Sequence, residues 1–297
     1  MLYKENQSHF AYLILSYKSD DMTLDLVNKI REFDFKSTIV VVDNSKENKP
    51  LELKLSSIGN LNFISSGANL GYAKGNNLGL KYLSKRGDIN YVFICNPDID
   101  VNKASINLMK DAIYNNKGIA ILGASVHDNQ SNCQISHWNS NTLIQDIAGD
   151  FSFVRFFSRD FNKSSKNDEQ SELIECDVVT GAFFLADLDI LRSIDYFDER
   201  TFLYCEERIL AKRLDNIGAK RFVLKEASCR HEGSSTISIK FSSRLKRHLL
   251  LVKSRQIYYR YYINQIKLFI YSLSIPFSIL EKVIIDAIIY IFKVFKK

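Results

Sequence analysis

The order of apolar runs in the first half of the chain constrains its fold more than any other feature. Short runs such as "NYVFICN" are apolar throughout, as expected for strands that are buried on both faces of a parallel sheet. The segments between these runs carry apolar residues at helical spacing. This alternation predicts an α/β fold with a mixed, mainly parallel sheet flanked by helices. Strands are expected at 10–17, 37–43, 61–67, 90–96 and 118–126, and helices at 22–33, 75–87 and 104–116.

The second half of the chain has a less regular pattern. Residues 127–172 are rich in polar side chains, which predicts a flexible loop or lid region. Order returns with a helix that opens at Glu206 and a strand that leads to His231. We therefore expect one domain at 1–244 and a helical tail at 245–297.

The basic charge of the protein belongs to its tail. The formal net charge is +6, to which residues 240–297 contribute +10 and residues 1–239 contribute −4. A nucleic-acid-binding protein more often carries its positive charge on the folded domain, so no nucleic-acid partner is expected. A basic tail with aromatic residues is typical of attachment to an anionic membrane surface.

The tail is predicted to lie on a membrane without crossing it. Its longest uncharged run, 268–280, has 13 residues and contains Pro276, whereas a span needs about 20. Because no leader segment precedes the first strand, we expect a cytoplasmic protein attached to the inner face of the cell membrane. The alternative is that the tail covers the domain or forms a homodimer interface. Side chains expected at the headgroup boundary are Lys267, Lys282, Lys293, Lys296, Lys297, Tyr271, Phe277, Tyr290, Phe292 and Phe295.

The five cysteines are scattered and show no CxxC spacing. This distribution argues against both a disulfide framework and a zinc site. We expect reduced cysteines that mostly pack in the interior.

Acidic residues follow directly after the strand in "VFICNPDIDV". Pro97 has no backbone N–H to donate, so the strand is expected to end near Asn96. The carboxyl ends of parallel strands face the crevice in which ligands bind, so Asp98 is a candidate to hold a metal or a hydroxyl group. In an extended strand Asp100 would point to the same side as Asp98.

Two other stretches have the residue types of a nucleotide site. Asp43 ends the second strand, where its carboxylate can accept hydrogen bonds from a ribose or a base, with a simple turn as the alternative. In "NLGYAKGNNLGL", Gly71 and Gly75 permit close backbone approach and Asn76 offers an amide, whereas Gly79 is expected to be a packing position. The GxGxxG motif of a dinucleotide oxidoreductase is missing after the first strand, which disfavours that class.

Glu206 and Glu207 open a helix whose N-terminal end favours ionised carboxylates. Adjacent helical residues point about 100° apart, so one glutamate is expected to face a site while the other orients its neighbours. His231 ends a strand, where it can ligate a metal or contact a phosphate. For each of these residues, a solvated or structural role is the alternative.

Six stretches, taken in this order, resemble the family 2 glycosyltransferases of GT-A fold: "VVVDNSK", "NLGYAKGNN", "CNPDID", "TGAFFLA", "FLYCEER" and "HEGSST". The resemblance covers roughly residues 10–240 and is nearest to the rhamnosyl- and galactosyl-type enzymes of bacterial surface polysaccharide assembly. It implies a Rossmann-like nucleotide-diphospho-sugar transferase fold. Agreement between the motif order and the strand and helix pattern supports it.

The resemblance also implies roles for the matching residues. Asp98 would bind Mg²⁺ or Mn²⁺, with Asp100 as an auxiliary ligand and His231 near the diphosphate. Glu207 would be the catalytic base, with Glu206 as the fallback. The nucleotide and donor sugar would contact Asp43, Asn44, Ser45, Gly71, Gly75, Asn76, Asn96, Gly181 and Ala182.

The chain departs from the family pattern at three positions. Lys18 stands where the first-strand motif usually has asparagine, Glu207 replaces the usual aspartate, and Ile209 occupies a place that is often acidic. The last two make the base assignment less secure, but none of them affects the predicted fold.

The activity implied by the resemblance is a metal-dependent, inverting sugar transfer. The donor would be dTDP-rhamnose or a UDP-hexose, and the acceptor a hydroxyl of a lipid-linked oligosaccharide in polysaccharide assembly. The alternative is a nucleotide-sugar-binding scaffold protein without catalytic activity.

Overall fold

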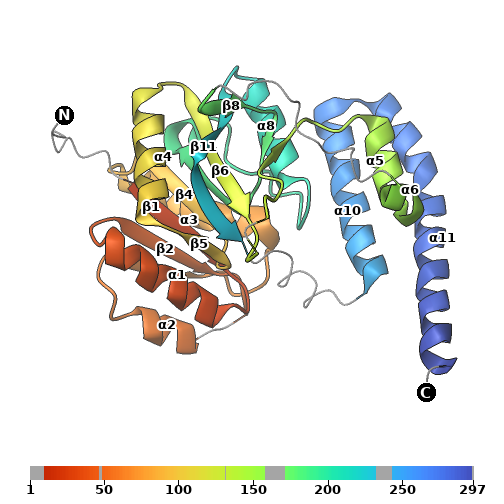
Figure 1. The fold of residues 1–297 in the computed structure, drawn as a ribbon, viewed down its shortest axis with the longest axis horizontal. Helices are drawn as coiled ribbons and strands as arrows, with labels where there is room; N and C mark the ends of the chain where they lie inside the picture. Colours follow the sequence, from red (N-terminus) through yellow and green to blue (C-terminus); the bar gives the residue numbers. More distant parts are fainter. Residues whose placement is uncertain (1–9, 47–48, 131, 158–170, 232–242, 296–297) are drawn as a thin grey trace.

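The computed structural model describes residues 10–46, 49–130, 132–157, 171–231 and 243–295. It consists of an α/β domain and a helical unit that stands beside it (Figure 1). The helical unit combines the C-terminal helices with two short helices from the middle of the chain.

The described strands of the domain form one main sheet in the order β3-β2-β1-β4-β10-β6-β11-β5, with β8 beside β11. The first four strands in this order are parallel, and β10 is antiparallel to both of its neighbours. β6 therefore runs in the same direction as β4, and β11 is parallel to β6. The strands are β1 Phe10–Ser16, β2 Thr38–Asp43, β3 Leu61–Ser65, β4 Tyr91–Cys95, β5 Ile99–Val101, β6 Ile119–His127, β8 Leu173–Glu175, β10 Phe183–Asp187 and β11 Lys220–His231. A small second sheet pairs β7 His137–Trp138 with β9 Val178–Val179.

Helices cover both faces of the main sheet, and each face has its own buried apolar cluster. One cluster includes side chains of α1 Asp20–Phe33, α2 Lys49–Leu55 and α4 Lys103–Asn115. The other includes side chains of α3 Gly71–Arg86, α7 Leu188–Ser193 and α8 Glu206–Asp215. The predicted α/β fold is confirmed, and the strand before the "NPD" stretch ends at Cys95, one residue before the predicted end.

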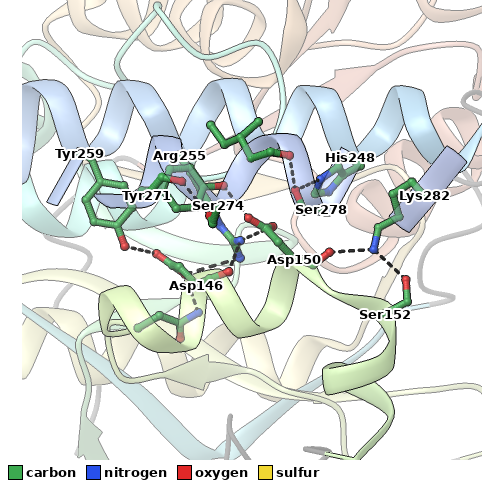
Figure 2. Close-up of polar contacts among 12 residues, drawn as sticks. Asp146, Asp150, Ser152, His248, Arg255, Tyr259, Tyr271, Ser274, Ser278 and Lys282 are labelled. Carbon is green, nitrogen blue, oxygen red and sulfur yellow. Dashed lines mark hydrogen bonds and ion pairs between the residues drawn. The ribbon is translucent and has the colours of Figure 1, made fainter. Parts of the chain in front are cut away.

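The prediction of a loop or lid over 127–172 is wrong for part of that segment. The structure forms β7 there, together with α5 Leu143–Asp150 and α6 Ser152–Phe157, while residues 158–170 lie outside the described ranges. α5 packs against the C-terminal helices and buries the side chains of Asp146 and Asp150 (Figures 1 and 2). The composition concealed this helix because its polar side chains are the ones that face inward.

The predicted helical tail is present as α10 Arg244–Tyr258, the π-helical turn η1 Tyr259–Ile263 and α11 Gln265–Phe295. Pro276 lies inside α11 without ending it. Among the described residues, no helix combines the length and the apolar character that a membrane crossing requires.

α11 has an unusual distribution of side chains. The hydroxyl and amino groups of Tyr271, Ser278 and Lys282 face inward and are buried, and their spacing places them on one side of the helix (Figure 2). Tyr271 donates to Asp150 at 2.7 Å, and Lys282 donates to the Asp150 carbonyl oxygen at 2.7 Å. The prediction that Tyr271 and Lys282 lie at a headgroup boundary is therefore wrong, because α5 and α6 supply buried polar partners for them. Large apolar side chains of α11 are exposed instead: Ile266, Phe269, Ile270, Leu273, Phe277, Leu280, Val283, Ile284, Ile288, Ile289, Tyr290, Ile291 and Phe292.

All five cysteines are free thiols, and only Cys133 is exposed. The prediction that the cysteines mostly pack in the interior is confirmed.

Candidate active site

The "NPD" stretch brings Asp98 next to His231. Beyond β4, the chain turns at Pro97 into β5, which pairs antiparallel with the end of β11 and sets Ile99 opposite His231. This pairing places Oδ2 of Asp98 3.4 Å from Nε2 of His231. The Asp98 side chain is only 7% exposed. Two candidate metal ligands, more than 130 positions apart in the sequence, therefore meet at the edge of the sheet.

Asp100 has a different environment from Asp98. Its carboxylate forms ion pairs with Lys29 of α1 and with Arg230 of β11, whose Nε donates to it at 2.9 Å. Two cations thus neutralise Asp100, so a metal ion would have to compete with both of them. In this structure Asp100 is an ion-pair partner, and its role as an auxiliary metal ligand stays a prediction.

Two small residues, Gly181 and Ala182, directly precede β10, and the Glu207 side chain lies against the first of them. A Cβ atom on Gly181 would come within 2.6 Å of Oε1 of Glu207. The next residue, Ala182, accepts a backbone hydrogen bond from Asn96 at 2.8 Å. Gly181 and Ala182 therefore lie between the end of β4 and the start of α8. The "NPD" stretch and the glutamate pair are on the same side of the molecule.

The two glutamates differ in burial and in their pKa values. Burial raises the pKa of Glu206 well above its usual range, and the charge of Glu207 raises it further. Burial also raises the pKa of Glu207, but the backbone N–H groups of Glu207 itself and of Gly181 counteract this effect. Oε1 of Glu206 is buried and has no hydrogen-bond partner in the described part of the chain. When two acids share a buried site, each one disfavours ionisation of the other, and here the pKa of Glu206 is the more strongly raised of the two.

The turn into α8 has an uncommon backbone conformation. Tyr204 and Cys205 have φ angles of +74° and +65°, in the left-handed region that favours glycine. Such strain persists only where the surroundings enforce it. Here Ser254 of α10 donates to the Leu203 carbonyl oxygen at 2.8 Å and thereby holds the turn against the helical unit.

The predicted nucleotide residues lie where β1 and β2 end. Asp43 is buried opposite Ser16, and burial raises the pKa of its carboxyl group. The hydroxyl of Ser45 donates to Asp43 at 2.8 Å. Asn44 uses its amide within the chain, because it donates to the Gly71 carbonyl oxygen at 3.0 Å and accepts from Leu70 N–H at 2.9 Å. The side chain of Asn44 thus shapes the loop before α3.

Gly71 and Gly75 are required by close packing. A Cβ atom on Gly71 would lie 2.2 Å from the backbone oxygen of Phe202, and one on Gly75 would lie 2.5 Å from the Leu15 side chain. Gly79 likewise faces Leu13, which confirms its predicted packing role. Asn76 is fully buried, and its Oδ1 atom has no hydrogen-bond partner among the described residues.

Tyr72 was not singled out from the sequence, although it lies inside the "NLGYAKGNN" motif. Its hydroxyl donates to the Gly181 carbonyl oxygen at 2.6 Å. Burial raises the pKa of Tyr72, and the charges of Glu207 and Glu206 raise it further. The phenol therefore stays protonated and fixes the Gly181 peptide beside the glutamate pair.

Asp98 and His231 suit a divalent cation. Adjacent ligands of an octahedral ion at about 2.1 Å stand roughly 3 Å apart, which is close to the 3.4 Å between the two side-chain atoms. Mg²⁺ and Mn²⁺ take few protein ligands when a diphosphate and water supply the others. Within the described ranges, no group of three or more His, Cys, Asp or Glu side chains could share a metal. Asp98 and His231 would therefore supply two of the ligands of such a cation.

Comparisons with known proteins give a partial sequence match and a shared fold. No protein-family model matches the chain. The low-salt glycan biosynthesis hexosyltransferase Agl10 of Haloferax volcanii is 32% identical over 96 residues, which cover 32% of this chain and 30% of that protein. The match thus spans less than a third of that relative's length.

Two solved structures share the fold. The crystal structure of GalNAc-T7 with UDP, GalNAc and Mn²⁺ matches 88% of this chain and 50% of its own, with a TM-score of 0.62 and 10% identity. S. aureus TarS 1–349 matches 85% of this chain and 72% of its own, with a TM-score of 0.51 and 16% identity. The predicted GT-A fold is confirmed, and at 10% and 16% identity the likeness shows the fold alone.

Proposed function

We propose that the protein transfers a sugar from a nucleoside diphosphate donor to a hydroxyl of a lipid-linked oligosaccharide, with inversion at the anomeric carbon. The proposal rests on the position of Gly181 and Ala182. Gly181 lies against the Glu207 side chain, and the Ala182 carbonyl oxygen accepts a hydrogen bond from the Asn96 N–H. The similarity to a hexosyltransferase supports the same activity. Both dTDP-rhamnose and a UDP-hexose are candidate donors.

Glu207 acts as the general base in this proposal. An alcohol is a poor nucleophile, so its proton must be taken up as the glycosidic bond forms. The raised pKa of Glu207 makes it a stronger base than an exposed carboxylate. Protonated Glu206 leaves Glu207 with the negative charge, and Tyr72 holds the adjacent Gly181 peptide in place.

The departing diphosphate would bind at the edge of the sheet near Asp98. A Mg²⁺ or Mn²⁺ ion held by Asp98 and His231 would act as a Lewis acid on the negative charge that develops there. The buried carboxylate of Asp43 would accept hydrogen bonds from the nucleoside. Asn44, Ser45 and Gly71 would keep the surrounding loop closed around it.

The distribution of side chains on α11 supports the proposal of a lipid-linked acceptor. This helix turns polar groups inward and large apolar side chains outward, the reverse of a helix that covers a soluble domain. A bilayer surface would receive the apolar face, and an acceptor confined to that bilayer would then lie close to the enzyme. We therefore propose peripheral attachment at the cytoplasmic face of the membrane, in polysaccharide assembly. A homodimer formed through α11 is the competing explanation.

The test is a panel of nucleotide sugars assayed with Glu207→Gln and Glu206→Gln variants. Loss of a general base costs about 10²–10⁴-fold in rate, so Glu207→Gln should lose at least about a hundredfold in kcat. Glu206→Gln mimics the protonated acid and should lose much less. Donor binding without turnover in the wild-type protein would overturn the proposal in favour of a binding scaffold. A larger loss in Glu206→Gln would move the base role to Glu206.

A further inference from the structure

A cavity of about 350 Å³ lies where α5 and α6 meet α10 and α11. It is distinct from the Asp98–His231 edge of the sheet. Three of its lining side chains are cationic: Arg244, Arg247 and Lys282. Figure 2 shows Lys282, His248 and Asp150 beside one another in this region.

The negative charges near this cavity already have partners. Asp150 lines it, but its carboxylate accepts hydrogen bonds from Arg255 at 2.5 Å and from Tyr271 at 2.7 Å. Glu281 is bound to Lys282 and accepts from the backbone N–H groups of Ser152 and Phe153. These contacts hold the acids in the wall, so the cavity itself presents cationic groups.

Arg244 and Arg247 are the two guanidinium groups that line the cavity. Lys282 donates to Asp150, Ser152 and Glu281, so its ammonium hydrogens are already used within the protein. Arg244 is 43% exposed, and its ion pair with Asp286 is long, at 4.0 Å. His248 bonds to Ser278 at 2.9 Å, and burial lowers its pKa, so it is neutral at physiological pH. A guanidinium group matches the geometry of phosphate oxygens.

The position of the cavity indicates that its ligand is part of a lipid. Lys282 lines the cavity from the inward side of α11, while Phe277 and Leu280 are exposed on neighbouring turns. If the exposed face of α11 rests on a bilayer, the cavity lies one helix diameter, about 10 Å, from the acyl chains, within reach of a lipid phosphate. A phosphate on a lipid can then enter it while the chain remains in the membrane.

Tyr204 connects the cavity with the candidate active site. It lines the cavity and precedes Glu206 by two residues. Burial raises the pKa of Tyr204, the charge of Arg247 lowers it, and the charge of Glu206 raises it. The phenol thus lies within the electrostatic range of both the basic wall and the acidic pair.

We propose that this cavity binds the phosphate group of the lipid-linked acceptor, with Arg244 and Arg247 as its ligands. The identity of the lipid rests on the proposed function, whereas the cationic cavity does not. A phosphate seated here would hold the attached sugar chain on the same side of the helical unit as Tyr204 and α8.

Binding to vesicles tests this inference without any turnover. The full-length protein is titrated with neutral phosphatidylcholine vesicles that contain either a polyprenyl diphosphate or phosphatidylglycerol, matched for surface charge. We expect the wild-type protein to bind the diphosphate vesicles at least about tenfold more tightly, and the Arg244→Gln/Arg247→Gln double variant to lose that preference. Lys246→Gln is the matched control, because Lys246 is an exposed cation between the two arginines that does not line the cavity. It should keep the ratio.

Two outcomes would overturn the inference. One is an equal affinity of the wild-type protein for both kinds of vesicle, which would assign the binding to surface charge alone. The other is a double variant that keeps the preference, or a Lys246→Gln variant that loses it equally. Donor binding and thermal unfolding of each variant show that the catalytic domain is folded. A preference for diphosphate vesicles in a protein without transferase activity would refute the proposed function and leave the cavity assignment intact.

Discussion

Arg208, the residue after Glu207, donates two hydrogen bonds to the buried carboxylate of Asp146, at 3.0 and 2.9 Å. Asp146 also accepts from the hydroxyl of Tyr259 at 2.7 Å and lies 3.5 Å from the guanidinium group of Arg255. These contacts connect α8 to α5 and to the C-terminal helices. The helix that carries the candidate base is thus fixed to the proposed membrane-binding unit.

Removal of this carboxylate should destabilise the protein. Asp146→Ala leaves the buried Arg208 without its acid, and breaking a buried ion pair in this way costs about 3–5 kcal/mol. We expect a lower free energy of unfolding in urea. Lys212→Ala on the same helix is the control, because its pair with Asp215 is exposed and 3.7 Å long, and such pairs contribute at most about 1 kcal/mol. Equal losses in the two variants would contradict this prediction.

Glu206 should make stability depend on pH. Its pKa is raised in the folded state, so the folded protein binds this proton more tightly than the unfolded chain does. The contribution to stability is then full below the unfolded pKa and is lost as pH rises toward the folded pKa. We expect the difference in Tm, Glu206→Gln minus wild type, to increase between pH 5 and pH 8. Each kcal/mol of stability that the wild type loses relative to the variant should add about 2–4 °C to this difference. Glu226→Gln, at an exposed position, controls for the loss of one charge. A Tm difference that does not change with pH would show that Glu206 carries no raised pKa.

Replacement of Asp98 or Asp100 by asparagine should have different effects on nucleotide affinity. Asp98→Asn should weaken binding of a nucleoside diphosphate in the presence of Mn²⁺ by about tenfold or more, because a lost charge-assisted contact is worth about 1.5–3 kcal/mol. Asp100→Asn removes only the ion pairs with Lys29 and Arg230 and should leave that affinity unchanged. Titration calorimetry with and without Mn²⁺ measures both variants. A loss confined to Asp100→Asn would reassign the metal site.

Gly181→Ala should reduce turnover with little effect on folding. The new Cβ atom would meet the flexible end of Glu207 at 2.6 Å, so the carboxylate would be displaced. A misplacement of about 1 Å in a catalytic group can cost about a hundredfold in rate. Gly71→Ala provides the contrast, because its Cβ atom would meet the Phe202 backbone at 2.2 Å and its φ angle is +83°. We expect that variant to lose Tm instead, and the reverse pattern would refute both assignments.

Much of the fold followed from local patterns in the sequence. The apolar runs that became β1, β2 and β4 are buried on both sides, so their composition alone identifies them as central strands. Pro97 set the end of β4 because it cannot donate to a ladder. The backbone positions of Asp98 and Glu207 were likewise predictable, since one follows the end of a strand and the other opens a helix.

The tertiary structure decided what each polar side chain meets. Asp98 and Asp100 are two residues apart, yet one contacts His231 and the other is held by Lys29 and Arg230. α5 was predicted to be part of a loop, and Tyr271 and Lys282 of α11 were predicted to face a membrane, because periodicity shows which residues share a face but not which face is inward. That choice depends on partners from distant parts of the chain, here Asp146 and Asp150, which draw the polar sides of both helices into the interior.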